Sequence, residues 1–191
     1  MIVRTAELDD LVRLSSVTAR LSNVSSPLGG IFGNVRSSGH KAHRGWDLYA
    51  AIGTVCFAVA DGEVSSERYD KSGYGRYVTI KLFGAEIDRL AAQFGATQLF
   101  ALYGHLSPGT IARRSCILAG TPVARTGNSG NASNTPPHLH FELRLGKKVG
   151  TKNKTVIEPG ERIDPGLLLG YKALSSRSSD RAVLSSMFKI R

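Results

Sequence analysis

The chain has 191 residues, of which 41% are hydrophobic and 21% charged, a composition typical of a folded globular protein and unlike a disordered or coiled-coil chain. Its 25 Lys and Arg outnumber its 15 Asp and Glu, so the net charge is +10, which favours binding to polyanions. The charge alone does not distinguish between nucleic acid, anionic lipid and bacterial wall polymers. No apolar run approaches the roughly 18 residues that a membrane helix needs, which excludes an integral membrane segment.

Residues 1–25 are predicted to form an N-terminal extension to the folded domain. Glu7, Asp9 and Asp10 stand where a cleavable secretory signal would carry apolar residues, so no signal peptide is expected in the sequence as given. The glycine-rich run at residues 27–36 that follows predicts turns and loops.

Short segments rich in β-branched and aromatic residues then recur between glycines and turn residues. This spacing predicts an all-β domain built mainly from antiparallel strands. The segments are residues 46–50, 54–60, 63–69, 75–83, 98–106, 121–126 and 138–145. 

One segment departs from this pattern. In residues 85–94, the apolar positions Ile87, Leu90, Ala91 and Phe94 have the spacing of one helical face. We therefore expect a short helix inserted in an expanded hairpin, beside the strand that ends near residue 106.

The remaining features of the C-terminal half are a basic loop and a tail. Residues 144–154 contain five basic residues and no acidic one, which predicts an exposed loop, and residues 170–191 are predicted to be a Ser-rich, basic, little-structured tail. Cys56 lies in an apolar run and is expected to be buried, whereas its pairing with Cys116 depends on geometry and stays open.

Two of the five histidines, His138 and His140, flank Leu139 in a predicted strand. Residues i and i+2 of a strand point to the same face, so the two imidazoles project together. They could share a metal, or one could bind it while the other transfers protons. Two exposed strand histidines with no chemical role are the alternative.

A second pair, His43 and Asp47, supplies one nitrogen and one oxygen four residues apart. With one histidine of the later pair it makes three protein ligands, the number typical of catalytic zinc with a fourth position free for water. His105 ends an apolar strand before a Ser-Pro turn, and beside such a site it would orient water or steady a transition state. Alternatively, Asp47 is a carboxylate that caps a loop and His105 is a histidine packed in the core.

The motifs HRGWD (43–47), YGHL (103–106) and HLHFEL (138–143), in this order, resemble those of the M23 zinc metallopeptidases, the peptidoglycan endopeptidases of the lysostaphin and LytM type. The flanking stretches GTVCFA (53–58), ADGEV (60–64), GYGRYVTI (73–80), GNSG (127–130) and DP (164–165) are also similar to that family. The resemblance spans residues 26–169, and several independent motifs in order are far more specific than any single one.

The resemblance implies a domain over residues 26–169 with the LytM-like, duplicated-hybrid-motif fold. It also implies that His43, Asp47 and His140 bind one Zn²⁺ per chain and that His105 and His138 are the catalytic pair. The substrate implied is a peptide cross-link or stem peptide of peptidoglycan. One departure is the absence of a tyrosine from residues 27–42, where some members carry an oxyanion donor.

Three classes of function follow: a zinc endopeptidase, a non-catalytic wall-binding or amidase-activating module of the same fold, and a nucleic-acid-binding protein suggested only by the charge. The intact ligand set favours the first over the second, and the sequence carries no nucleic-acid-binding motif. The substrate would lie in the cell wall, periplasm or extracellular space. Without a signal peptide, delivery would use a phage, lysis or a secretion machine, with an immunity protein as a further partner, unless the chain is truncated.

Overall fold

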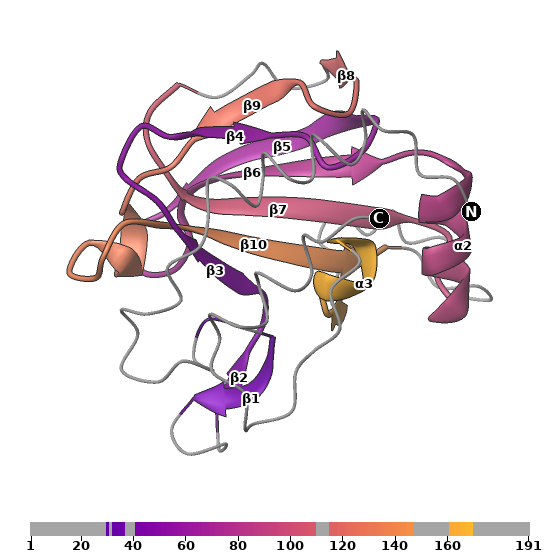
Figure 1. Ribbon diagram of the computed structural model, residues 1–191, viewed down its shortest axis with the longest axis horizontal. Coiled ribbons are helices and arrows are strands. Elements are labelled where there is room, and N and C mark those ends of the chain that lie inside the picture. Colours follow the sequence, from indigo (N-terminus) through magenta and orange to yellow (C-terminus); the bar gives the residue numbers. More distant parts are fainter. Residues whose placement is uncertain (1–29, 31, 37–40, 110–114, 147–160, 170–191) are drawn as a thin grey trace, which may run out of the picture.

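The computed structural model describes residues 30, 32–36, 41–109, 115–146 and 161–169. Most of them form antiparallel strands, which confirms the predicted fold class (Figure 1). The main sheet has the strand order β11–β10–β7–β6–β5–β8, and β3 pairs with β10 outside this path. Its strands are β3 (Trp46–Tyr49), β5 (Gly62–Asp70), β6 (Gly75–Leu82), β7 (Leu99–Leu106), β8 (Cys116–Ile117), β10 (His138–Leu145) and β11 (Glu161–Ile163).

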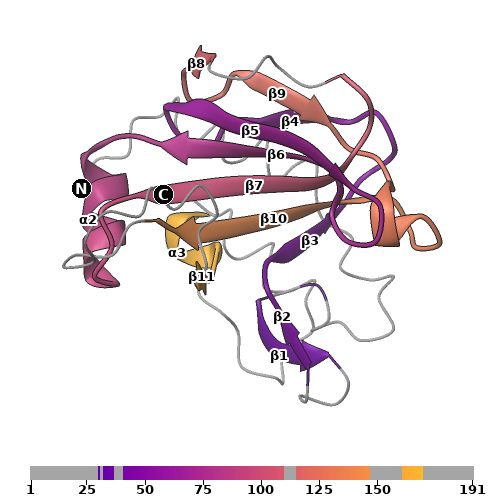
Figure 2. The ribbon, with the colours of Figure 1, turned by 180° about the vertical axis from the view of Figure 1, so that it is seen from behind.

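Two small sheets accompany the main one. β1 (Gly33–Arg36) pairs with β2 (Lys41–His43), and β4 (Val55–Phe57) pairs with β9 (Pro122–Arg125). Seen from both sides, β4 and β9 lie next to the β5 end of the main sheet, whereas β1 and β2 lie beyond β3 (Figures 1 and 2). The Tyr103 hydroxyl joins the β4 segment to β7, because it donates to the Phe57 carbonyl at 3.0 Å and accepts from the Val59 N–H at 3.1 Å.

β7 and β10 are neighbouring interior strands of the main sheet, and every residue of both strands is buried. The near-continuous apolar sequence of β7 suits a strand covered on both faces, whereas β10 alternates polar and apolar residues. Tyr103 and Phe141 stand opposite each other in the ladder, with their rings in edge-to-face contact at 5.1 Å between centroids. This rigid pair of strands carries the predicted site residues His105, His138 and His140.

The helical insertion is confirmed as α2 (Ala85–Gln93). Ile87, Leu90 and Ala91 are buried as the helical spacing predicts, but Phe94 follows the helix and is 39% exposed. Figure 1 shows α2 at the start of β7, at the opposite end of that strand from His105. The insertion therefore does not border the predicted site. The other helical pieces are η3 (Gly130–Ala132) and α3 (Gly166–Leu169).

Arg144 corrects the predicted boundary of the basic loop. We expected residues 144–154 to be exposed, but β10 continues through Leu145 and the Arg144 side chain is buried. The strand persists because Leu143, Arg144 and Leu145 pair with β7 on one side and β11 on the other. Residues 147–154 lie outside the described residues, as do residues 1–25, His40 and residues 170–191.

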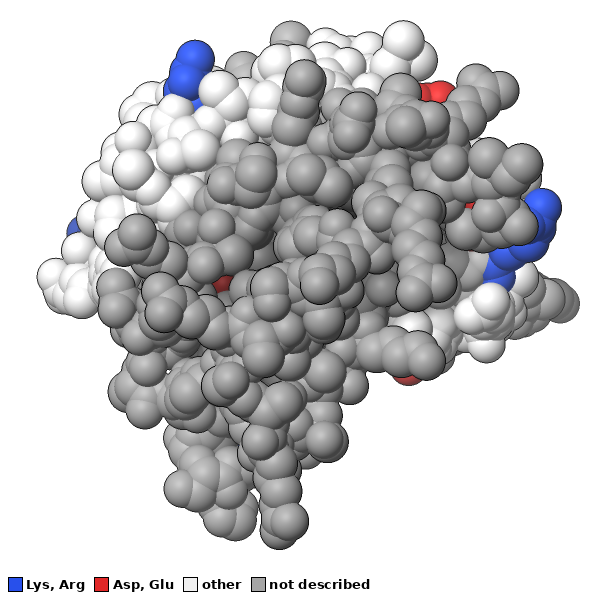
Figure 3. All heavy atoms as spheres, viewed as in Figure 1, with Lys and Arg blue, Asp and Glu red and all other residues white. Residues whose placement is uncertain are grey.

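Cys56 is buried, as predicted, and both Cys56 and Cys116 are free thiols. Burial raises the pKa of the Cys56 thiol to about 12, so it is an inert packing group. In the described part of the chain, no helix is both long and apolar enough to cross a membrane. On the face seen in Figure 3, the Lys and Arg atoms of described residues lie at separate edges and form no continuous patch.

Candidate metal centre

The candidate centre is built on β10, where alternate side chains point to the same face. His138 and His140 both approach the same carboxylate oxygen, Asp47 Oδ1, at 3.7 and 2.8 Å. Both imidazoles are buried, so they are not a pair of exposed strand histidines. Leu139 and Phe141 between and after them are fully buried in the core, as the strand period predicts.

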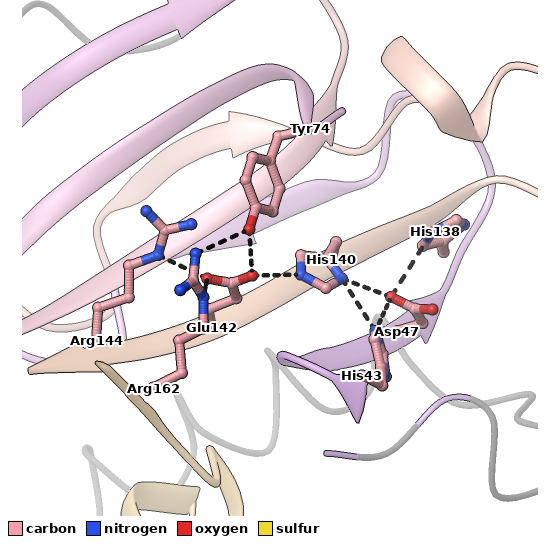
Figure 4. A network of polar contacts seen from close by, with 8 residues as sticks. All are labelled: His43, Asp47, Tyr74, His138, His140, Glu142, Arg144 and Arg162. Atoms are coloured by element: carbon pink, nitrogen blue, oxygen red, sulfur yellow. Dashed lines mark hydrogen bonds and ion pairs between the residues drawn. The ribbon is translucent and has the colours of Figure 1, made fainter. Parts of the chain in front are cut away.

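Strand pairing brings Asp47 to this face. β3 runs antiparallel to β10 with Asp47 opposite His140, so the two side chains meet across the ladder. His43 ends β2, and its side chain points to the same place (Figure 4). Three side chains from three strands, separated by up to 97 residues in sequence, thus converge on one buried point.

The donor atoms of these three residues lie close to the spacing of ligands in a tetrahedral zinc site. His43 Nε2 lies 3.2 Å from Asp47 Oδ1 and 3.3 Å from His140 Nδ1, and the last two atoms are 2.8 Å apart. A tetrahedral zinc ion with bonds of 2.0–2.1 Å places its ligand atoms about 3.3 Å from one another. Within the described ranges, this is the only group of three His, Cys, Asp or Glu side chains with such convergence. Two imidazole nitrogens and one carboxylate oxygen fit zinc.

Gly45 allows the link between His43 and Asp47 to pass close to β10. A Cβ atom at this position would lie 2.3 Å from the Phe141 carbonyl oxygen and 2.9 Å from Glu142 Cγ. No side chain can occupy this space without moving the backbone. Glycine is therefore required at position 45 because the backbone passes so close to β10, and not because its backbone angles are unusual.

Gly45→Ala is expected to push the β2–β3 link away from β10 and to separate His43 from His140. Overpacking of this kind costs about 1–3 kcal/mol, and 1.4 kcal/mol corresponds to tenfold weaker zinc binding. Competition against a chromophoric chelator measures the affinity. Gly104→Ala is the matched control, since its Cβ would meet atoms only at an ordinary 3.5 Å. Equal zinc affinity in the two variants would contradict this role of Gly45.

His105 and His138 lie beside the donor set with one ring nitrogen each committed to a backbone carbonyl. His105 Nδ1 is 2.9 Å from the Ser129 oxygen, and His138 Nδ1 is 2.8 Å from the Pro136 oxygen. A carbonyl oxygen only accepts, so each Nδ1 carries the proton and each neutral ring keeps its lone pair on Nε2. The two rings are in contact, with 4.9 Å between centroids.

The backbone of His105 adopts a left-handed conformation, with φ of 58°. A residue other than glycine rarely adopts this conformation, and here the His105 N–H donates to the Tyr74 carbonyl at 2.7 Å. The loop at residues 127–135 supplies Ser129 as the partner of the His105 ring. Backbone and loop together hold the ring at the end of β7.

Electrostatics at the centre favour a negative Asp47 and a neutral His105. Burial raises the pKa of the Asp47 carboxyl, but hydrogen bonds from His140 and His43 outweigh it and hold the pKa well below its usual value. Burial, together with the neighbouring His138 and His140, lowers the pKa of His105 to about 4. Burial also lowers the pKa of His140. Its hydrogen bonds to Asp47 and Glu142 have the larger effect and raise the pKa to about 9. Without metal, a proton on His140 therefore lies among the three donor atoms.

A second polar cluster lies directly behind His140 (Figure 4). His140 Nε2 is 2.9 Å from Glu142 Oε1, which also accepts the Tyr74 hydroxyl at 2.8 Å. The other oxygen, Glu142 Oε2, accepts from Arg144 Nε at 2.6 Å and from Arg162 Nε at 3.0 Å. Burial raises the pKa of Glu142, but its bonds to His140 and the two arginines prevail and lower it to about 2.

A model of Peptidase family M23 matches residues 41–165. The chain belongs to this family. The match includes all five predicted site residues, and the M23 assignment agrees with the resemblance seen in the three histidine motifs.

Three relatives show how far the similarity extends. An uncharacterized metalloprotease of Haemophilus influenzae is 30% identical over 126 residues, which is 66% of this chain and 23% of the relative. The peptidoglycan DD-endopeptidase ShyC of Vibrio cholerae is 30% identical over 103 residues, 54% of this chain and 20% of the relative. The chain thus spans less than a quarter of the length of these curated relatives. The catalytic domain of a variant of the prophage-encoded M23 protein EnpA from Enterococcus faecalis is 27% identical with a TM-score of 0.53, covering 75% of this chain and 87% of that one.

Proposed function

We propose that the chain is a zinc-dependent endopeptidase that hydrolyses peptide cross-links or stem peptides of bacterial peptidoglycan. The observation that carries the proposal is the buried convergence of His43 Nε2, Asp47 Oδ1 and His140 Nδ1, beside two further histidines whose Nδ1 atoms are bonded to backbone carbonyls. A structural zinc site would use four protein ligands. Three ligands with adjacent proton-transfer groups are typical of a catalytic site.

His43, Asp47 and His140 would hold the metal. Zinc bound there would polarise a peptide carbonyl and lower the pKa of a water molecule from about 16 toward about 7. His138 shares the β10 face with His140, and its Nε2 can accept the proton of the attacking water and return it to the leaving amine.

His105 is better suited to orient water than to stabilise an oxyanion. With Nδ1–H donated to the Ser129 carbonyl, the Nε2 atom of the neutral ring is an acceptor. It can receive a hydrogen bond from water but cannot donate one to a developing negative oxygen. The oxyanion donor therefore belongs to another group.

The substrate class rests on the family and on the relatives. ShyC is named as a peptidoglycan DD-endopeptidase, and peptidoglycan peptides are the substrate that we propose for this chain. The net charge of +10 would favour retention on an anionic cell wall. Action there requires delivery to the wall, as a phage lysin or an antibacterial effector would be delivered, with delivery machinery and an immunity protein as partners.

The test is metal content and sacculus digestion on one preparation of the full chain. We expect about one zinc per chain after loading, release of soluble muropeptides from sacculi, loss of release on treatment with a chelator, and recovery on zinc addition. Stoichiometric zinc without release from any wall type would replace the proposal with a wall-binding or amidase-activating module. Failure to bind zinc would refute the proposed chemistry.

A further inference from the structure

The cluster behind His140 contains a buried carboxylate with an unusually complete set of donors. Glu142 is fully buried, and its two oxygens together accept from the His140 ring, the Tyr74 hydroxyl and two guanidinium groups. Arg162 Nη2 lies 3.3 Å from the Tyr74 oxygen and closes the network. Such a network is rigid because each of its members fixes the position of the next.

The arrangement of the two arginines shows that Glu142 is the centre of this network. Arg144 on β10 and Arg162 on β11 stand directly opposite each other in the antiparallel ladder. Two like charges in this position destabilise a sheet unless an anion lies between them. Both guanidinium groups turn their Nε atoms to the same oxygen, Glu142 Oε2, which offsets the repulsion.

The donors also fix which oxygen faces His140. An arginine only donates, so the atom facing Arg144 and Arg162 must be an acceptor, and Oε1 is left for His140 and Tyr74. A carboxylate oxygen can only accept from an imidazole N–H. His140 Nε2 therefore carries a proton that points away from Asp47. Nδ1 faces Asp47 and His43, and a second proton carried there without metal occupies the place that a metal would take.

We propose that Glu142 is a positioning residue: held by Tyr74, Arg144 and Arg162, it fixes the His140 proton on Nε2 so that Nδ1 presents its lone pair to the metal. This inference rests on the proposed function, because it assigns a role to Glu142 through the metal ligand. Partners of this kind orient the ring and set the tautomer of a ligating histidine, and their loss reduces metal affinity by about 10–100-fold.

Glu142→Gln tests the proposal through the direction of the new amide. The two arginines will draw the amide oxygen to the place of Oε2, so the NH₂ group will occupy the place of Oε1 and donate to His140 Nε2. In the zinc-free variant, the ring proton should therefore lie on Nδ1, toward Asp47. Nuclear magnetic resonance of the full chain with ¹⁵N-labelled histidine reads the protonation of each ring nitrogen directly.

We expect His140 Nε2 to be protonated in the zinc-free wild type and unprotonated in Glu142→Gln, and zinc affinity to fall by about 10–100-fold in the variant. Glu67→Gln, which removes a carboxylate from an exposed position on β5, is the control and should change neither quantity. A protonated Nε2 with wild-type zinc affinity in Glu142→Gln would overturn the positioning role. Failure of the wild type to bind zinc would instead overturn the proposed function, since the proton is read without metal.

Tyr74→Phe keeps the proposal testable if Glu142→Gln does not fold. The change removes the hydroxyl that donates to Glu142 Oε1 and accepts from Arg162 Nη2, and it keeps the aromatic ring that lies 5.6 Å from the His140 ring. With one donor fewer on that oxygen, the bond from His140 Nε2–H should shorten and its proton resonance should move downfield. An unchanged resonance would show that His140 is not held by Glu142.

Discussion

His138→Ala is expected to abolish peptidoglycan cleavage while leaving zinc bound. Removal of a general base typically lowers the rate by about 10²–10⁴-fold. The metal should remain because His138 Nε2 is 3.7 Å from Asp47 Oδ1, the longest of the three histidine contacts with this oxygen. Muropeptide release and zinc content, measured on the same preparation, check the two halves of this expectation.

His105→Ala is the comparison for this variant, because it removes the neighbouring ring with the same kind of backbone anchor. We expect zinc retention in both variants and the larger loss of turnover in His138→Ala, since a ring that orients water contributes less than one that accepts its proton. Loss of zinc in His138→Ala would indicate that His138 is a metal ligand. Wild-type cleavage by His138→Ala would remove it from the mechanism.

The sequence was sufficient to predict the helix and most of the described strands, but not β1, β2, β8 and β11. The seven predicted segments contain most of β3, β4, β5, β6, β7, β9 and β10, because alternation and flanking glycines are local signals. β1, β2, β8 and β11 have two to four residues each, β1 and β2 pair only with each other, and β8 and β11 pair with β5 and β10. Such segments carry no local signal of their own.

The strand period predicts a whole row of side chains on one face of β10. Residues 138 and 140 were assigned to one face, and the same step of two leads to Glu142 and Arg144, which complete the row on β10. The basic composition after Leu143 favoured a loop at Arg144 and hid this continuation. The sequence alone therefore predicts no role for Glu142.

Contacts between distant segments lay beyond any reasoning from local sequence. Arg162 reaches Glu142 from β11, and Trp46, next to the proposed ligand Asp47, donates its indole N–H to Asp164 Oδ1 at 2.7 Å across 118 residues. The register that places Asp47 opposite His140 likewise depends on tertiary structure and cannot be predicted from local sequence. The resemblance to the M23 family implies the ligand set, but only the folded chain shows that Arg162 on β11 and Asp164 after it contact residues next to that set.

Asp47→Asn is expected to remove zinc and activity together, the opposite pattern to His138→Ala. Asp47 Oδ1 is the atom on which His43, His138 and His140 converge, and it is the only anionic donor in the proposed set. Burying a dication against neutral donors alone is costly, because its charge is no longer balanced where water is excluded.

The expected loss of zinc affinity in Asp47→Asn is at least about 100-fold, since even the outer partners of zinc ligands contribute 10–100-fold. Asparagine has nearly the same volume as aspartate, so packing between β3 and β10 should survive, and circular dichroism of the zinc-free variant checks this. Asp88→Asn, an exposed change on α2 at the far end of β7, should bind zinc and digest sacculi as the wild type does. Wild-type zinc affinity in Asp47→Asn would mean that the metal is held by other atoms, and the buried charge of Asp47 would then serve only to hold the histidines together.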